Sequence, residues 1–299
     1  MKMKDIWIVL GVIIIVGAVF TGIKFQKVKK ESAKRMEFYL NQVETFDTTF
    51  GKMSYIDAGD GEAIISCHGI CGGFDQAYDS LGERIDTYRI IAPSRFGYTG
   101  TDMPVQATIE DQAKAYVELL DHLKIDRAYI LATSAGGTSA IEFALKYPER
   151  TKGLILFCSA YPQFETPEKE ISYAGPPAFL CNDFMMWFFS PLFQPLMGMD
   201  AETIKMIMPF GDKKAGIVYD AKVTNTDMHN NPQQYDLRNL KVPVLILHAK
   251  DDKLSPCDLV EKWSREIPNC DAILFESGGH LMEGNSERID EELDHFITK

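Results

Sequence analysis

The stretch from Ala128 to Tyr147 constrains the fold more than any other part of the chain. Its first residues, Ala128 to Leu131, are apolar like a buried strand, and its last, Thr138 to Tyr147, have the pattern of a helix. They are joined by Ala132, Thr133, Ser134, Ala135, Gly136 and Gly137. A sharp strand-to-helix turn needs small residues and would lift the Ser134 hydroxyl off the sheet edge. The alternative is that Ser134 caps the helix, because serine is a favoured N-cap residue.

From about Phe46 onward, short apolar strands alternate with amphipathic helices. Such alternation predicts an α/β fold with a mostly parallel sheet covered by helices on both faces. Ligands bind such sheets beyond the carboxyl ends of the strands, which is where Ser134 is expected. The predicted strands are Lys52–Asp57, Ala63–Cys67, Arg89–Pro93, Ala128–Thr133, Gly153–Ser159, Val242–Ala249 and Ala272–Glu276. The predicted helices are Ile109–Leu123 with Thr108 as N-cap, Ala135–Tyr147, Pro256–Ile267 and Ser286–Ile297.

A long insertion, about residues 160–240, interrupts this alternation between two predicted core strands. It is rich in phenylalanine and methionine. The run Phe184–Phe189 consists of large apolar residues only, which is more than one buried helix face can hide. Part of it must therefore face a pocket, the main domain or lipid. We expect a helical cap over the serine, inserted into an α/β domain of residues 44–299.

The chain begins with a segment of a different kind. Ile6 to Ile23 is an uncharged, almost wholly apolar run of about 18 residues, the lower range for crossing a bilayer as a helix. We expect residues 1–23 to be a single-pass anchor in the cell membrane. Residues 24–43 are then a basic, helix-prone linker that could also lie on anionic lipid. A cleaved signal peptide is the alternative, with Val16–Ala18 as its cleavage site, but the apolar run continues past that site.

The charge pattern argues against one class of partner, but it does not decide on which side of the membrane the large domain lies. Basic residues after the apolar run outnumber Lys2 and Lys4, which would keep the large domain in the cytoplasm. A short basic start before an apolar run also resembles an export signal, which would place the domain outside. The net charge of −12 and the lack of a basic groove argue against nucleic acid as a partner. The six cysteines show no zinc-like spacing, so we expect reduced thiols and no metal.

A serine hydroxyl is a poor nucleophile unless a base removes its proton and an acid orients that base. Among six histidines, His280 is the best candidate base, because it lies in the glycine loop Ser277–Leu281 directly after the last predicted strand. The strand Val242–Ala249 runs into Asp251 and Asp252, which are the candidate acids. For each residue the alternative is a purely structural role, as a surface loop residue for the histidine and as solvated or helix-capping residues for the aspartates.

With these residues in place, the chain from about Phe46 to its end resembles the α/β-hydrolase fold family. In that family the nucleophile, the acid and the histidine come in this order along the chain. The resemblance implies a triad of Ser134, Asp252 and His280. It favours Asp252 over its neighbour because the family's acid follows a small residue by three places, as Asp252 follows Ala249.

Two further turns carry the resemblance. The run His68–Gly73 resembles the family's His-Gly oxyanion turn, and Ser94–Tyr98 resembles its Arg-Gly turn. The resemblance implies that the backbone N–H groups of Ile70 and Ala135 form an oxyanion hole. One departure is Ala132, which replaces the first glycine of G-x-S-x-G. The nucleophile is serine and not aspartate, so the family's dehalogenase and epoxide hydrolase chemistry is not expected.

The resemblance implies a serine hydrolase that cleaves a carboxylic ester through an acyl-enzyme intermediate, without metal or cofactor. The aromatic and methionine-rich insertion, together with the anchor, favours a small substrate with a hydrophobic acyl group. A carbon–carbon bond hydrolase of the ring-cleavage-product type has the same fold and triad, and the sequence does not separate the two. A third alternative is a catalytically silent module whose capped pocket binds a hydrophobic ligand.

Overall fold

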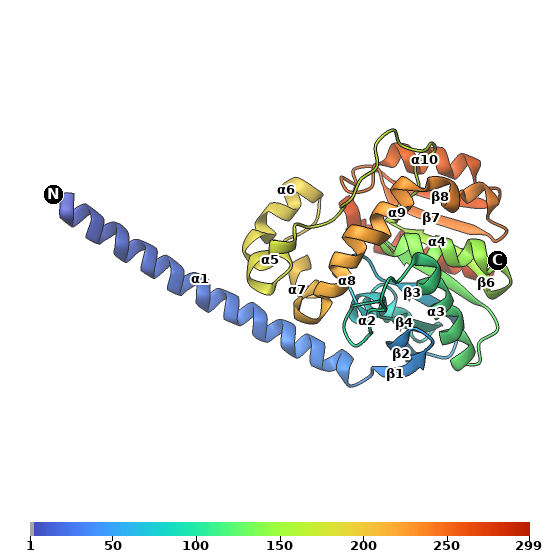
Figure 1. Cartoon of the computed structure of the whole chain (residues 1–299), viewed down its shortest axis with the longest axis horizontal. Coiled ribbons are helices and arrows are strands. Elements are labelled where there is room, and N and C mark those ends of the chain that lie inside the picture. Colours follow the sequence, from blue (N-terminus) through green and yellow to red (C-terminus); the bar gives the residue numbers. More distant parts are fainter. Residues whose placement is uncertain (1–2) are drawn as a thin grey trace.

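The structure is a computed structural model that describes residues 3–299. Within these residues the centre is an eight-stranded sheet of order β1-β2-β4-β3-β5-β6-β7-β8 (Figure 1). β2 pairs antiparallel with β1 and β4, and the remaining pairs are parallel. The predicted α/β sheet is confirmed. The strands are β1 (Glu44–Thr48), β2 (Gly51–Ala58), β3 (Glu62–Cys67), β4 (Tyr88–Pro93), β5 (Ala128–Thr133), β6 (Thr151–Phe157), β7 (Val244–Ala249) and β8 (Cys270–Phe275).

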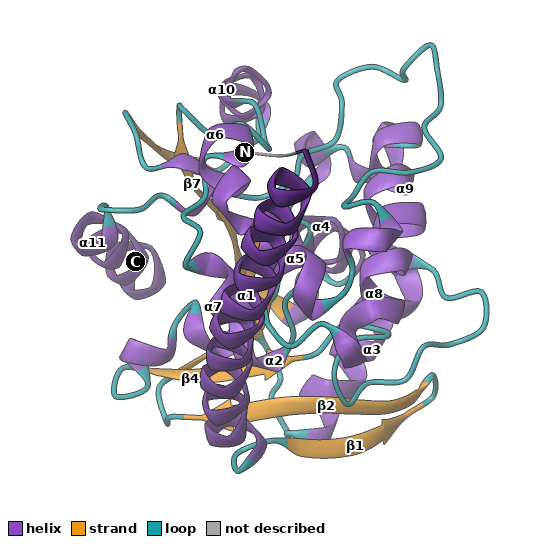
Figure 2. Cartoon of the chain, turned by 90° about the vertical axis from the view of Figure 1, so that its left-hand side faces the viewer, coloured by secondary structure: helices purple, strands orange, loops and turns teal. Residues whose placement is uncertain are grey.

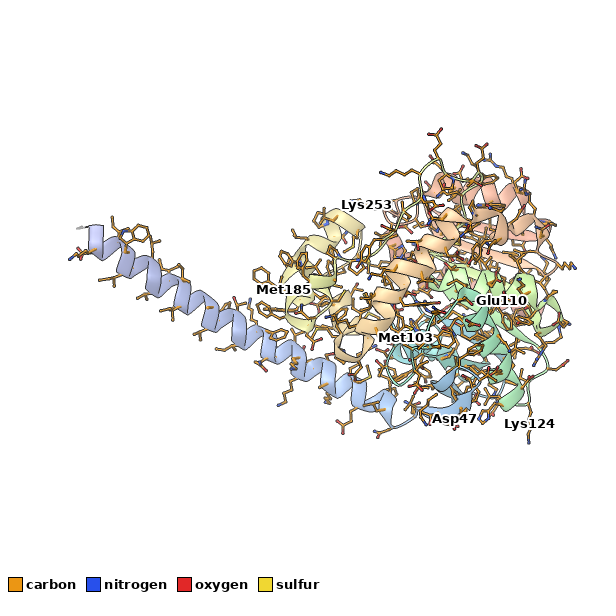
Figure 3. The ribbon with its side chains drawn as sticks, in the orientation of Figure 1. Asp47, Met103, Glu110, Lys124, Met185 and Lys253 are labelled. Atoms are coloured by element: carbon orange, nitrogen blue, oxygen red, sulfur yellow. The ribbon has the colours of Figure 1, made fainter. Side chains whose placement is uncertain are left out.

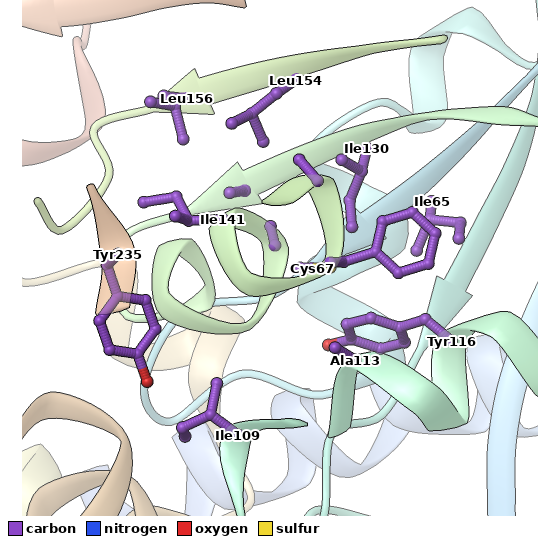
Figure 4. Packing of buried hydrophobic residues seen from close by; sticks show 14 of the residues in the cluster. Ile65, Cys67, Ile109, Ala113, Tyr116, Ile130, Ile141, Leu154, Leu156 and Tyr235 are labelled. Atoms are coloured by element: carbon purple, nitrogen blue, oxygen red, sulfur yellow. The ribbon is translucent and has the colours of Figure 1, made fainter. Parts of the chain in front are cut away.

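Helices cover both faces of the sheet, as the sequence predicts. On one face, Ile130 and Leu154 of the strands meet Ile141 and Tyr116 of two covering helices (Figure 4). Thr108 is the N-cap of the helix that carries Tyr116, as predicted, and forms a capping box there. This face carries α3 (Ile109–His122), α4 (Gly136–Lys146) and α10 (Cys257–Glu266), and the other carries α2 (Phe74–Asp79), α11 (Ser286–Thr298) and the end of α1 (Met3–Leu40).

The strand order places a crevice between β3 and β5. From β3 the chain crosses to β4 on one side and later returns to β5 on the other side. At such a reversal the connections leave to opposite faces, which opens a crevice beyond the carboxyl ends. The turn after β3 begins at His68, and Ser134 directly follows β5. Both motifs found in the sequence therefore lie at the same crevice.

The insertion between β6 and β7 is helical, and we call residues 160–240 the cap. Its own apolar cluster includes Phe193, Met208 and Phe210, and it packs on Cys71 and Tyr98 of the main domain. The cap consists of η3 (Ala178–Leu180), α5 (Asp183–Phe189), η4 (Ser190–Leu192), α6 (Phe193–Met197), α7 (Thr203–Ile207), η5 (Gly211–Lys213), α8 (Lys214–Tyr219), η6 (Asp220–Thr224), α9 (Asn225–Asn230), η7 (Pro232–Tyr235) and η8 (Leu237–Asn239). Short 3-10 turns elsewhere are η1 (Gly82–Arg84), η2 (Pro148–Arg150) and η9 (Gly279–Leu281).

Helix α1 projects from the domain on the side where α5, α6 and α7 lie (Figure 1). Its apolar part is long enough to cross a membrane by length and composition, and none of its most apolar window is buried. The helix continues without a break through residues 24–40, which the sequence analysis assigns to a linker. Its last turns bury Ser32, Met36 and Tyr39 against the domain. The end of the membrane segment at residue 23 stays a prediction. Residues 24–40, however, are helical, and their last turns pack on the main domain.

A buried charge cluster joins α1, α2 and the cap. Asp75 of α2 accepts hydrogen bonds from Arg35 of α1 at 3.0 Å and from Lys213 of the cap at 3.2 Å. The side chains of Asp75 and Lys213 are fully buried. Burial lowers the pKa of Lys213, and the charge of Asp75 opposes that shift. Because a buried charge is costly without a partner, these three segments hold one another in place.

We expect Lys213→Met to lower the free energy of unfolding by about 3 kcal/mol, because Asp75 then keeps only Arg35 as a partner in a buried place. The measurement is urea unfolding of the full chain in mild detergent. The exposed neighbour Lys214 supplies the matched control, and Lys214→Met should change stability by less than about 0.5 kcal/mol. Equal effects of the two substitutions would show that the cluster does not stabilise the fold.

Candidate active site

Ser134 forms a sharp elbow between β5 and α4. Its φ of 50° lies in the left-handed region, which non-glycine residues seldom adopt. The N–H of Ser134 donates to the carbonyl of Phe157 at 3.2 Å, and its carbonyl accepts from the N–H groups of Gly137 and Ala160 at 2.9 and 3.0 Å. These bonds stabilise the strained backbone. The Ser134 side chain makes no capping bond to α4, so only the backbone carbonyl of Ser134 bonds to the first turn of the helix.

The structure brings Ser134, His280 and Asp252 together from the carboxyl ends of β5, β8 and β7. Ser134 Oγ lies 2.9 Å from Nε2 of His280, and Nδ1 of His280 lies 2.8 Å from Oδ2 of Asp252. If Nδ1 carries the proton and donates to the carboxylate, Nε2 is free to accept the serine proton. His280 and Asp252 are buried, while Ser134 is partly exposed. The three side chains therefore form one hydrogen-bonded chain that ends at an accessible hydroxyl.

The environment of Asp252 favours its charged form. Burial acts to raise its pKa, but the hydrogen bond and charge of His280 outweigh burial, and the pKa lies below its ordinary value. The N–H groups of Leu254 and Ser255 also donate to Oδ1, at 2.8 and 3.1 Å. Nearby His248 lies with Nε2 3.6 Å from Oδ2, and burial lowers its pKa, so it stays neutral. Asp252 is thus an ionised partner held in one orientation.

Asp251, the acid that the family pattern passes over, holds the histidine loop. Its carboxylate accepts from the N–H of Gly279 at 2.9 Å and from that of Gly278 at 3.4 Å. Both glycines have positive φ, at 61° and 136°, so the loop that carries His280 depends on residues without a β-carbon. The two adjacent aspartates therefore have separate tasks, one on the histidine ring and one on its backbone. In the sequence, the only sign of a task for Asp251 is its position next to Asp252.

The elbow lies directly against the turn after β3. A β-carbon on Gly136 would lie 2.4 Å from the carbonyl oxygen of Cys67 and 2.7 Å from that of His68. A β-carbon on Gly69 would lie 3.1 Å from Cβ of Ser134. Close approach of the two backbones therefore requires the second glycine of the motif. The first glycine position tolerates Ala132, whose side chain is buried in the sheet.

The backbone N–H groups predicted for the oxyanion hole belong to these two adjoining turns. Within residues 3–299, neither Ile70 nor Ala135 donates its N–H to a protein acceptor. Gln76 of α2 fixes the first turn by accepting the N–H of Gly69 at 2.9 Å. Nothing in the sequence around Gln76 indicates this role, because Gln76 lies seven residues after Gly69 and reaches it only in the folded chain. Two unpaired donors beside Ser134 suit a developing oxyanion.

Hydrogen bonds between His68 and Arg95 stabilise the oxyanion turn. The N–H of Arg95 donates to Nε2 of His68 at 2.9 Å, and its Nε donates to the His68 carbonyl at 3.0 Å. Burial, followed by the charge of Arg95, places the pKa of His68 well below its ordinary value. His68 is therefore neutral and occupied, and does not compete with His280 as a base. Arg95 also forms a bidentate ion pair with Asp220 of the cap, with both contacts at 2.6 Å.

Comparison with known proteins decides the family. The family model described as the alpha/beta hydrolase fold matches residues 62–228. The chain belongs to this family. The match begins at β3 and includes the oxyanion turn, the elbow and most of the cap.

Similar proteins are hydrolases of more than one kind. An uncharacterized hydrolase of Bacillus subtilis, YcgS, is 28% identical over 81% of this chain and 92% of its own length. A 2-hydroxy-6-oxo-6-phenylhexa-2,4-dienoate hydrolase of Burkholderia cepacia is 26% identical over 75% of this chain and 83% of its own. The structure of an esterase from Thermogutta terrifontis covers 86% of this chain and 98% of its own with a TM-score of 0.67 at 23% identity, and shows the shared fold. The chain is therefore an enzyme of the hydrolase class.

We expect Gly136→Ala to lower the free energy of unfolding by about 1–3 kcal/mol, because the new β-carbon must displace the backbone of the oxyanion turn. Hydrolase activity should fall by about 10²-fold, since an oxyanion donor moves with that turn.

The control is Ala132→Gly, which restores the family's usual glycine and adds no atoms. It should cost roughly 0.5–1 kcal/mol of stability and leave hydrolysis within about threefold. Equal activity in both variants would contradict the close-contact argument.

Proposed function

We propose that the protein is a serine hydrolase that cleaves a carboxylic ester with a hydrophobic acyl group. The observation that carries the proposal is the hydrogen-bonded chain from Ser134 through His280 to Asp252 at the crevice. An accessible hydroxyl, an imidazole in contact with it and a buried carboxylate in this order form the arrangement that activates a serine.

The geometry supports a two-step reaction. His280 Nε2 takes the proton of Ser134 as Oγ attacks the ester carbonyl, and Asp252 stabilises the resulting imidazolium. The N–H groups of Ile70 and Ala135 donate to the oxyanion of the tetrahedral intermediate. His280 then protonates the departing alcohol, leaving the acyl group on Ser134. Water attacks that ester, and His280 takes its proton. The bond between the acyl carbon and Oγ then breaks, His280 returns the proton to Ser134, and the free acid leaves.

The surroundings of the oxyanion turn favour a neutral substrate. Two buried cations lie beside it, Arg95 and Lys213, and each is already paired with a carboxylate, Asp220 and Asp75 respectively. Recruiting either cation to a substrate carboxylate would take away one of the partners of a buried acid, which is costly. The cap adds large apolar side chains, which suit a hydrocarbon acyl group.

A second candidate is hydrolysis of a carbon–carbon bond in a dienoate ketone. The name of the Burkholderia cepacia relative favours it, and the same triad can serve both reactions. We rank it second because such a substrate carries a carboxylate and the buried cations beside the turn are neutralised. Hydrolysis of a dienoate ketone with none of esters would reverse this order.

We also propose that residues 6–23 anchor the enzyme in the cell membrane. At 1.5 Å per residue this run of α1 spans about 27 Å, close to the roughly 30 Å of a hydrocarbon core. Its side chains are mostly exposed, which is unfavourable in water for such an apolar surface. The side of the membrane that carries the domain stays open.

The proposed mechanism predicts that Ser134→Ala lowers kcat/KM for a p-nitrophenyl ester by at least about 10³-fold, because the nucleophile is removed. Asp252→Asn should lower it by about 10² or more, because the imidazole loses its orienting charge. Ser264→Ala, on the outer helix α10, is the matched control and should retain activity. Full hydrolysis by Ser134→Ala in detergent-solubilised full chain would refute the mechanism.

The hydrophobic acyl preference has a separate test. Between acetyl and octanoyl esters, kcat/KM should rise by about 10-fold or more, because each buried CH₂ contributes up to about 0.8 kcal/mol. The measurement uses monomeric esters below their aggregation limit. A flat profile would contradict the acyl preference while leaving the triad intact.

A further inference from the structure

The cap carries an exposed apolar face that the proposed reaction does not use. Six large side chains from η3 to α7 are 40–67% exposed. We call these residues the cap's apolar face: Phe179, Phe184, Phe188, Leu192, Leu196 and Met206. Phe184 and Phe188 stack with ring centroids 5.8 Å apart. Exposed apolar side chains in this number on neighbouring short helices are unfavourable in water and mark a surface that another apolar body covers.

This face lies where α1 leaves the domain. Phe25 of α1 contacts Phe184 and Trp187 of α5, with ring centroids 5.2 and 5.4 Å apart. Glu31 of α1 forms an ion pair with Lys205 of α7 at 3.8 Å. Figure 2, turned so that α1 points toward the viewer, shows α5 and α7 beside the helix. The cap therefore packs on α1 itself.

The contact lies at the end of the apolar run. Phe25 follows Ile23 by two residues, which is about 3 Å along a helix axis. If the run to Ile23 fills the hydrocarbon core, Phe184 and Trp187 come to the level of the lipid headgroups. No separate rotation of the domain is needed, because α1 is fixed to it by Arg35 and Asp75.

The charges around this face suit anionic lipid. A groove between α1 and the cap, about 410 Å³ in volume, is lined by Lys29 and Lys214 beside Phe25 and Phe184. Asp183 also lines it, but its carboxylate accepts the N–H of Phe210. Lys24 and Lys30 of α1, which also follow the apolar run, add further positive charge near the groove. Cations beside exposed aromatic and aliphatic side chains are typical of surfaces that lie in a membrane interface.

We propose that the cap's apolar face docks on the bilayer that holds α1, with its side chains in the headgroup and upper acyl region. The occupant is an anionic phospholipid membrane. The inference rests on the proposed anchor and not on the proposed reaction. A cap in this position would let a hydrophobic ester pass from the bilayer to the enzyme without crossing water.

The test is the depth of nitroxide labels on the full chain in phosphatidylcholine–phosphatidylglycerol vesicles. Labels are placed by Phe188→Cys in α5 and Leu196→Cys in α6, in a Cys257→Ser, Cys270→Ser background that removes the two partly exposed thiols. Ile14→Cys reports the anchor. Glu110→Cys, on the far side of the domain from α5, is the matched control (Figure 3).

Power-saturation spectra give the accessibility of each label to oxygen, which partitions into lipid, and to a water-soluble nickel chelate. The oxygen-to-nickel ratio at positions 188 and 196 should be at least threefold that at position 110, and highest at position 14. Ratios at 188 and 196 equal to that at 110, with position 14 still in lipid, would overturn the docking proposal alone.

Two other outcomes also contradict it. Low access of both agents with spin–spin broadening at 188 and 196 would mean that a second copy of the chain covers the face. A water-exposed label at position 14 would refute the anchor and the docking together, and would leave the proposed reaction untouched because these spectra do not depend on hydrolysis.

Discussion

At Gly136 the chain has no room for a β-carbon, because two carbonyl oxygens of the turn after β3 occupy that space. This contact draws the elbow of β5 and the turn of β3 together at the point where strand order reverses. It explains why Ser134 has a left-handed backbone and why free N–H groups adjoin its hydroxyl. The rest of the site is built around this close approach. His280 and Asp252 reach Ser134 from the two strands that complete the same edge.

Two buried ion pairs connect the oxyanion turn and the helix after it to the cap. Arg95 supports the oxyanion turn with its side chain and binds Asp220 of the cap. Asp75 begins the helix after that turn and binds both Lys213 of the cap and Arg35 of α1. The cap and the N-terminal helix are thus attached to the elements that shape the oxyanion hole. A buried pair of this kind contributes little net stability, but separating it is costly, so it fixes relative position.

Local patterns predicted the fold and the residues that meet at the crevice, because their signals lie within a few neighbouring residues. The strand, serine and helix around Ser134, and the glycine loop of His280, needed no knowledge of distant contacts. Gln76 and Asp220 depend on which segments the fold brings together, so no local pattern could mark them. The adjacent aspartates mark Asp251 as a candidate acid, but its hydrogen bonds to the histidine loop depend on the fold. The polar edge strand β1 (Glu44–Thr48) also lacked an apolar signal, since its side chains are largely exposed.

The central claim is that Ser134 is a nucleophile activated by His280, and covalent labelling tests it most directly. The full chain in detergent is treated with a fluorophosphonate, and the adduct is counted by intact mass and located by peptide mapping. We predict one adduct per chain on Ser134, formed at least about 10²-fold more slowly in His280→Ala. No adduct on Ser134, or labelling at the same rate without His280, would contradict it.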